Sequence, residues 1–236
     1  MTTGALLVAR WLPVVLLVPV FGGLSRLPSV RLSMLFALTL LSWPTQPSVP
    51  PSLAAALAAQ LLAGLAVGAL VHAYAEAART LGGLGDQALG RGSLGVADPL
   101  AGSTSGPLET LFALAWVALV CGSGAHVLLL EAIALSFDAL PLAGAVPVDR
   151  ATRSVVDAVA ASLALATALA LPLFVVTWIV DSALGWVNRA LPSLSVSFLA
   201  LPARLALGLL VFAALVAPAV TLTLEATMRA LTAGTP

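Results

Sequence analysis

Carboxylates inside apolar segments are the residues of this chain whose type and placement could do chemistry. Glu76, Glu109, Glu131 and Asp181 lie within or at the ends of long apolar runs. A carboxylate at the centre of a bilayer costs about 3 kcal/mol or more, so such groups face protein or water. One interpretation is a relay for protons or ions. We favour a structural role, at a helix end or in an ion pair such as Glu76 with Arg79, three residues apart on one helix face.

The other reactive residue types form no catalytic or metal-binding pattern in the sequence. His72 and His126 lack the second histidine four residues away that a zinc-binding helix supplies, and the chain has no lysine for Schiff-base chemistry. Cys121 lies in an apolar run and is expected to be a small core residue. Residues 90–95 match G-x-G-x-x-G but lack the preceding strand of a dinucleotide site. We therefore expect no enzyme activity, no metal and no cofactor.

The composition indicates an integral membrane protein. Of the 236 residues, 61% are hydrophobic and only 8% are charged, and the mean hydropathy is +1.11. A soluble domain carries about 25% charged residues, so this chain cannot cover a water-facing surface. Ten basic residues balance ten acidic ones, which leaves no basic patch of the size that nucleic acid needs. Soluble enzymes, disordered chains and nucleic-acid-binding proteins are therefore excluded.

The apolar runs predict an all-α membrane fold of five to six hydrophobic helices, some of them kinked or broken. A spanning helix needs about 20 mostly apolar residues. The expected helical segments are residues 5–24, 32–43, 53–75, 108–137, 158–180 and 205–224. The second is too short to span unless it tilts or packs inside protein. The last two are expected to form a helical hairpin.

Small residues are expected to shape two parts of the chain. Gly64 and Gly68 form a G-x-x-x-G motif, which lets two helix backbones approach closely. The alternative is that the motif only reflects a composition rich in alanine and glycine, and we favour a packing face. Residues 81–99 are glycine-rich, and glycine costs about 1 kcal/mol relative to alanine inside a helix. We therefore expect a bent or broken helix there, followed by a loop.

Several features, in order, resemble one family. They are residues 26–31, 76–82, the Asp98-Pro99 pair, and residues 124–126, 136–144 and 184–196. Together they resemble the FliR/SctT family (SpaR and YscT among its names), the export-gate subunit of type III secretion systems and of the flagellar export apparatus. The resemblance extends over nearly the whole chain.

The resemblance implies partners and a location. It implies a complex with FliP/SctR-like and FliQ/SctS-like membrane subunits and with a FlhB/SctU-like switch subunit, in the bacterial inner membrane. Residues 1–150 would correspond to the first partner and residues 151–236 to the helical hairpin of the second. The complex would conduct unfolded proteins.

The resemblance also implies that a loop plugs the passage. The loop consists of Gly95, Val96, Ala97, Asp98, Pro99, Leu100, Ala101, Gly102, Ser103, Thr104, Ser105, Gly106 and Pro107. Two alternatives stay open. A small secondary transporter would use Glu109 and Glu131 as coupling sites but should show two related halves, and no internal symmetry is visible. A purely structural membrane scaffold would not need the loop.

Overall fold

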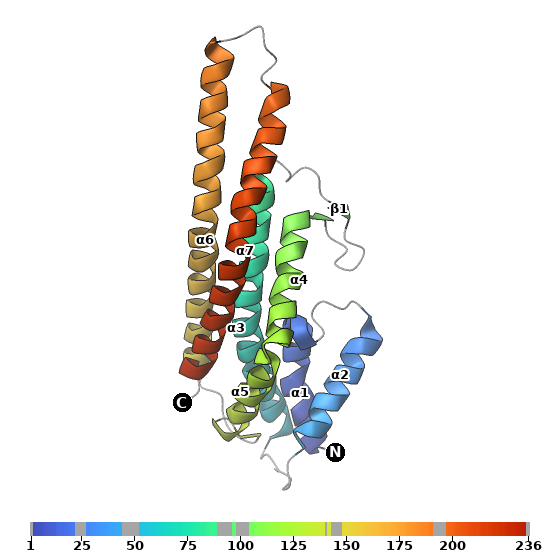
Figure 1. Ribbon diagram of the computed structural model, residues 1–236. Coiled ribbons are helices and arrows are strands. Elements are labelled where there is room, and N and C mark those ends of the chain that lie inside the picture. The colour runs from blue at the N-terminus through green and yellow to red at the C-terminus, as the bar shows by residue number, and fades with distance from the viewer. Residues whose placement is uncertain are drawn as a thin grey trace.

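The computed structural model describes residues 2–21, 27–43, 52–88, 96–97, 104–139, 141–142, 148–190 and 197–234, without the side chains of residues 96–97, 104–105, 138–139, 197–205 and 230–234. The described part contains α1 (Thr2–Leu17), η1 (Pro19–Phe21), α2 (Pro28–Leu41), α3 (Leu53–Ala88), α4 (Pro107–Gly122), α5 (Ala125–Ala139), α6 (Val148–Ala190) and α7 (Ser197–Gly234). A two-residue antiparallel pair joins β1 (Val96–Ala97) to β2 (Thr104–Ser105). The predicted all-α membrane fold is confirmed (Figure 1).

Helix α3 lies at the centre of the bundle and packs against α1, α4, α6 and α7. Helices α6 and α7 run antiparallel as a hairpin beside it, and α6 extends beyond the end of α3 (Figure 1). The main core lies between these helices, and Phe112 of α4 meets Phe212 of α7 edge to face with ring centroids 4.7 Å apart. Buried Trp116 and Leu173 belong to the same core. This packing fixes the height of α4 against α3 and the hairpin.

Three of the described helices are long and apolar enough to cross a membrane. They are α3, α6 and the Ala206–Arg229 part of α7, and the bent α4–α5 pair could count as a fourth. Helix α2 has 14 residues, about 21 Å at 1.5 Å per residue, which is shorter than the ~30 Å hydrocarbon core. The protein is therefore multi-pass.

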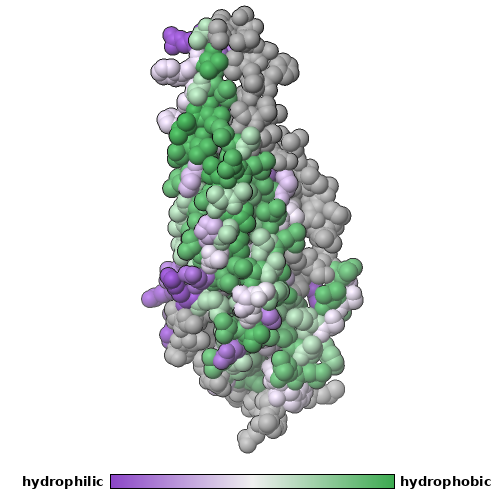
Figure 2. All heavy atoms as spheres, viewed as in Figure 1, coloured by the Kyte–Doolittle hydropathy of each residue, from purple (hydrophilic) through white to green (hydrophobic). Residues whose placement is uncertain are grey.

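The hairpin presents apolar side chains to its surroundings. Figure 2 shows hydrophobic residues over much of α6 and α7, with hydrophilic residues near the ends of the hairpin. Trp178 and Trp186 of α6 are 72% and 81% exposed. Large apolar side chains that are exposed together mark contacts with a membrane or with other proteins.

The segment expected as one helix over residues 108–137 is two helices. Helices α4 and α5 meet at an angle of 77° across Ser123 and Gly124. Gly124 has a φ of 74°, a conformation that favours glycine because it has no Cβ. The imidazole Nδ1 of His126 lies 3.3 Å from the carbonyl oxygen of Val120, a group that the break leaves without a helical partner. The sequence Gly122-Ser-Gly124 carried this signal.

Two further expectations were wrong. Helix α3 is unbroken at Gly82, Gly83 and Gly85 and continues to Ala88, whereas residues 89–95 of the glycine-rich stretch lie outside the described residues. Gly82 serves packing, because a Cβ on it would lie 2.5 Å from the carbonyl oxygen of Leu108. The close approach of α4 offsets the low helix propensity of glycine. Cys121 is exposed rather than in the core, because α4 turns Phe112 and Trp116 inward instead.

Candidate functional site

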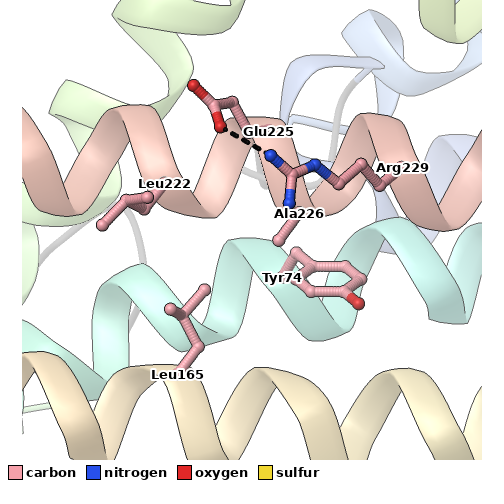
Figure 3. A pocket seen from close by; sticks show the side chains of 6 residues that line it. All are labelled: Tyr74, Leu165, Leu222, Glu225, Ala226 and Arg229. Carbon is pink, nitrogen blue, oxygen red and sulfur yellow. Dashed lines mark hydrogen bonds and ion pairs between the residues drawn. The ribbon is translucent and has the colours of Figure 1, made fainter.

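A pocket of about 290 Å³ lies between α3, α6 and α7 (Figure 3). Its lining residues are Tyr74, Leu165, Leu222, Glu225, Ala226 and Arg229. Glu225 and Arg229 form an ion pair of 3.2 Å along α7, and both side chains are largely exposed. An exposed pair one helical turn apart is typical of a helix surface and contributes less than ~1 kcal/mol. The lining offers apolar contact and one ion pair, with no arrangement for catalysis.

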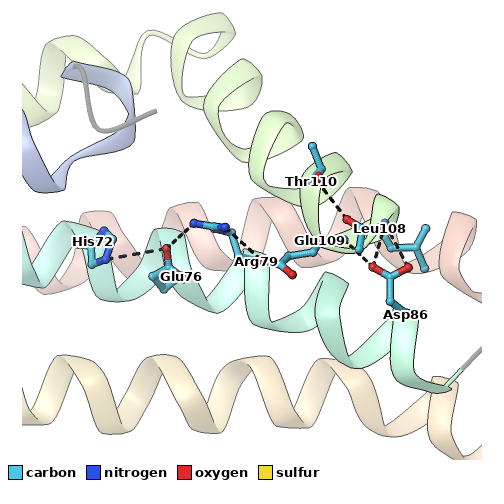
Figure 4. Close-up of polar contacts among 8 residues, drawn as sticks. His72, Glu76, Arg79, Asp86, Leu108, Glu109 and Thr110 are labelled. Atoms are coloured by element: carbon cyan, nitrogen blue, oxygen red, sulfur yellow. Dashed lines mark hydrogen bonds and ion pairs between the residues drawn. The ribbon is translucent and has the colours of Figure 1, made fainter. Parts of the chain in front are cut away.

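The end of α3 holds the start of α4 through a buried carboxylate (Figure 4). Asp86 is 2% exposed, and its Oδ2 accepts hydrogen bonds of 3.1 Å from the backbone N–H groups of Leu108 and Glu109. The residue before α4 is Gly106, which has no side chain to cap the helix. Asp86 therefore supplies, from another helix, the acceptor that a capping residue normally provides, and its charge is favourable at a helix N-terminus.

This cap ties the end of α3 to the start of α4, the two helices on either side of the segment predicted to be a plug. Asp86 lies nine residues before Gly95, where the predicted plug begins, and its partners Leu108 and Glu109 follow Pro107, where the predicted plug ends. Val96 pairs with Ser105 and Ala97 with Thr104 in the short ladder. The other predicted loop residues lie outside the described part of the chain: Gly95, Asp98, Pro99, Leu100, Ala101, Gly102 and Ser103. Residues 90–95, the G-x-G-x-x-G match, also lie outside it.

Four ionisable side chains form a line along α3 toward α4 (Figure 4). His72 Nε2 lies 3.9 Å from Glu76 Oε1, and its Nδ1 lies 3.0 Å from the carbonyl oxygen of Leu17. Arg79 donates to Glu76 Oε1 at 3.1 Å and to Glu109 Oε1 at 3.0 Å. The predicted Glu76–Arg79 pair is confirmed. We call His72, Glu76, Arg79 and Glu109 the polar stripe.

The stripe gives Glu109 a structural partner, whereas Glu131 and Asp181 are exposed on α5 and α6. We expect Glu109→Gln and Glu131→Gln to leave an export substrate secreted, with a loss of less than about fivefold, because the partly exposed Glu109–Arg79 pair contributes less than ~1 kcal/mol and Glu131 is exposed. Secretion by a deletion strain carrying each variant measures this. Complete loss of secretion, with normal amounts of the protein in membranes, would favour an ion relay instead.

A second polar cluster, which the sequence analysis missed, joins α1, α3 and α5. Arg10 is 1% exposed and donates to Gln60 Oε1 at 3.2 Å and to the Ser136 hydroxyl at 3.0 Å, with its guanidinium 4.1 Å from the centroid of the Phe137 ring. Gln60 Nε2 donates in turn to the Leu142 carbonyl oxygen at 3.2 Å. Arg10 and Gln60 were the only visible signal, as polar residues inside apolar runs. The cluster gives hydrogen-bond partners to the Arg10 guanidinium NH groups and to the Gln60 amide, and it ties three helices together.

The predicted packing glycines lie against α1. A Cβ on Gly64 would overlap the carbonyl oxygen of Arg10, and one on Gly68 would lie 3.2 Å from that of Pro13. Among the described residues, no group of three or more His, Cys, Asp or Glu side chains could hold a metal ion. The described residues thus show closely packed helices, a helix α4 whose start is capped by Asp86, and the polar stripe of paired charges.

Comparison with known proteins identifies the family. The model of "Bacterial export proteins, family 1" matches residues 1–230. The chain belongs to this family. It is also similar to the flagellar biosynthetic protein FliR of Caulobacter vibrioides (strain ATCC 19089 / CIP 103742 / CB 15), with 32% identity over 112 residues. That alignment covers 48% of this chain and 45% of the relative, so it spans just under half the length of the relative. The resemblance to the FliR/SctT family is confirmed.

Proposed function

We propose that this protein is the FliR/SctT-type subunit of a type III or flagellar export gate in the bacterial inner membrane. With FliP/SctR-like and FliQ/SctS-like subunits, and beside a FlhB/SctU-like subunit, it forms the channel entrance for unfolded proteins. The observation that carries the proposal is the family match over residues 1–230. Residues 1–150 act as the FliP/SctR-like part and residues 151–236 as the FliQ/SctS-like hairpin.

The structure supports a role inside an assembly. Helix α2 is too short to cross a bilayer, and its Leu32 and Phe36 are 63% and 66% exposed. The hairpin also exposes large apolar side chains, including Trp186, over a length greater than one bilayer thickness: the 43 residues of α6 extend about 65 Å. Protein neighbours would cover such surfaces better than lipid alone.

We expect the protein to be stable only with its partners. Tagged protein should co-purify with the FliP/SctR-like and FliQ/SctS-like subunits of the same bacterium when all are expressed together. Expressed alone, it should aggregate or be degraded, because its apolar surfaces stay uncovered. Size-exclusion chromatography in detergent and secretion by a deletion strain measure both effects. A monodisperse, heat-stable monomer, together with normal secretion in the deletion strain, would contradict the proposal.

We propose that residues 95–107 seal the passage. Deleting residues 101–103 keeps Pro99, Pro107 and the β1–β2 pairing, since three residues can still close a hairpin. The shortened loop should let small solutes pass, with the complex still assembled and secretion reduced modestly. Uptake of a small solute by cells expressing the variant with its partners measures the leak, and Ser103→Ala is the control of unchanged length. An assembled complex as tight as wild type would place the seal elsewhere.

A further inference from the structure

The pocket between α3, α6 and α7 is lined by a buried hydroxyl group that has no partner in the described part of the chain. Tyr74 of α3 is 6% exposed, and its side chain lies between α6 and α7 (Figure 3). Among the described residues, nothing forms a hydrogen bond with its hydroxyl. The hydroxyl of a buried tyrosine usually has such a partner. A molecule in the pocket could therefore supply one.

The other lining residues form an apolar wall and a charged rim. Leu165 of α6 and Leu222 and Ala226 of α7 supply the wall (Figure 3). Glu225 and Arg229 of α7 supply the rim, where their side chains are 58% and 82% exposed. A small ion would leave the wall uncovered, and a purely apolar molecule would leave the rim and the hydroxyl unused. The lining thus fits a ligand with a charged head next to an apolar part.

The pocket lies near the place where the hairpin changes from charged to apolar residues. The first ten residues of α6 hold four charged side chains, Asp149, Arg150, Arg153 and Asp157. Residues 158–180 of the same helix carry no charge. Leu165 is eight residues beyond Asp157, about 12 Å along the helix axis. Charged helix ends lie among lipid headgroups and apolar stretches lie in hydrocarbon, so a pocket near this change is within reach of a lipid headgroup.

We propose that this pocket binds the headgroup of a phospholipid that carries both a phosphate and a primary ammonium, as phosphatidylethanolamine does. The Tyr74 hydroxyl and the Arg229 guanidinium donate hydrogen bonds to phosphate oxygens, and the Glu225 carboxylate accepts from the ammonium. Leu165 and Leu222 contact the first carbons of the acyl chains. The pocket volume of about 290 Å³ is enough for a headgroup and too small for a whole lipid, because pockets for drug-sized molecules start at about 300 Å³.

The ion pair at the rim selects the type of headgroup. Glu225 and Arg229 lie 3.2 Å apart and are largely exposed, so separating them for a ligand costs less than about 1 kcal/mol. An anionic glycerol headgroup gains from Arg229 but is repelled by Glu225. A choline headgroup carries a positive charge but no N–H group to donate. A headgroup with both a phosphate and N–H donors satisfies Tyr74, Glu225 and Arg229 together.

The proposal goes beyond the export role and does not depend on it. One bound lipid occupies only the lining residues of this pocket, so protein neighbours can still cover the rest of the hairpin.

Native mass spectrometry of the purified complex tests the proposal. The complex is titrated with phosphatidylethanolamine or phosphatidylglycerol of identical acyl chains. We expect Tyr74→Phe, which removes only the hydroxyl, to weaken phosphatidylethanolamine binding about tenfold, because a hydrogen bond to a charged phosphate is lost. Glu225→Gln should abolish the preference for phosphatidylethanolamine, and Arg229→Gln should weaken binding of both lipids. The difference between wild type and variant isolates this pocket from lipid sites on the partner subunits.

Arg153→Gln is the matched control, because Arg153 is an exposed arginine of α6 outside the pocket lining, and it should change neither affinity. Equal binding of phosphatidylethanolamine by wild type, Tyr74→Phe and Arg229→Gln would overturn the proposal, as would a wild-type preference for phosphatidylglycerol at this site. Free glycerophosphoethanolamine that displaces the lipid at equal concentration would overturn the assignment to a lipid, because the acyl contacts would then contribute nothing. None of these outcomes bears on the proposed function, which secretion by the deletion strain tests separately.

Discussion

Replacing Gly64 by alanine is expected to separate α1 from α3 and to prevent assembly of the complex. The added Cβ overlaps the carbonyl oxygen of Arg10, a backbone atom that cannot rotate away. Overpacking of a close contact costs about 1–3 kcal/mol, and a backbone contact places this change at the upper end. The same displacement pulls the Arg10 guanidinium from Gln60, one helical turn before Gly64. A loss of about 3 kcal/mol corresponds to more than a hundredfold change in an equilibrium constant.

Two other glycines provide a graded control for this result. A Cβ on Gly68 has its nearest contact at 3.2 Å, so Gly68→Ala should lower the thermal stability of the purified complex only slightly. Gly185 lies in α6 with nothing within 4 Å of the added Cβ, so Gly185→Ala should be neutral or slightly stabilising. Complex yield and the midpoint of thermal unfolding in detergent rank the three variants. If Gly64→Ala assembled as well as Gly185→Ala, this would contradict the close contact between α1 and α3 at Gly64.

The sequence predicted the apolar helices because their signal is local. Long apolar runs are visible without tertiary information. The pairing of Glu76 with Arg79 was predictable for the same reason, since residues three apart share a helix face. The family resemblance also depended on residue order alone. These features need no knowledge of how the helices pack.

The features that sequence reasoning missed depend on distant residues. Arg10 meets Gln60 across 50 positions and Ser136 across 126, and Asp86 meets Leu108 across 22. Glycines that were expected to break α3 instead allow α4 to approach. Whether a glycine breaks a helix or permits close packing therefore depends on whether another helix lies against it. Local propensity is overridden wherever tertiary packing compensates for it. The buried polar contacts of Arg10 and Asp86 lie between helices rather than within them.

Replacing Asp86 by alanine is expected to release the start of α4 and the loop before it. The change leaves the buried N–H of Leu108 and that of Glu109 without their shared acceptor, which costs about 2–3 kcal/mol for hydrogen bonds to a charged group. Helix α4 should then fray over its first turn, and the start of α4 should separate from the end of α3. In the purified complex, amide hydrogen exchange over residues 104–112 should become at least tenfold faster, while exchange in α6 stays unchanged.

A second variant tests the same cap from the other side. Gly106 has φ −70° and ψ 157°, a conformation open to alanine, so Gly106→Ala introduces no backbone strain. Its Cβ would overlap the Asp86 carboxylate and displace it, so Gly106→Ala should reproduce the faster exchange although Asp86 is intact. Asp86→Asn retains one oxygen acceptor and should show a smaller effect, and Gln87→Ala, at the neighbouring exposed position, should show none. Unchanged exchange over residues 104–112 in both Asp86→Ala and Gly106→Ala would mean that Asp86 does not hold the loop. If exchange instead rises in both variants and small solutes leak through the assembled complex, the carboxylate that caps α4 also keeps the passage closed.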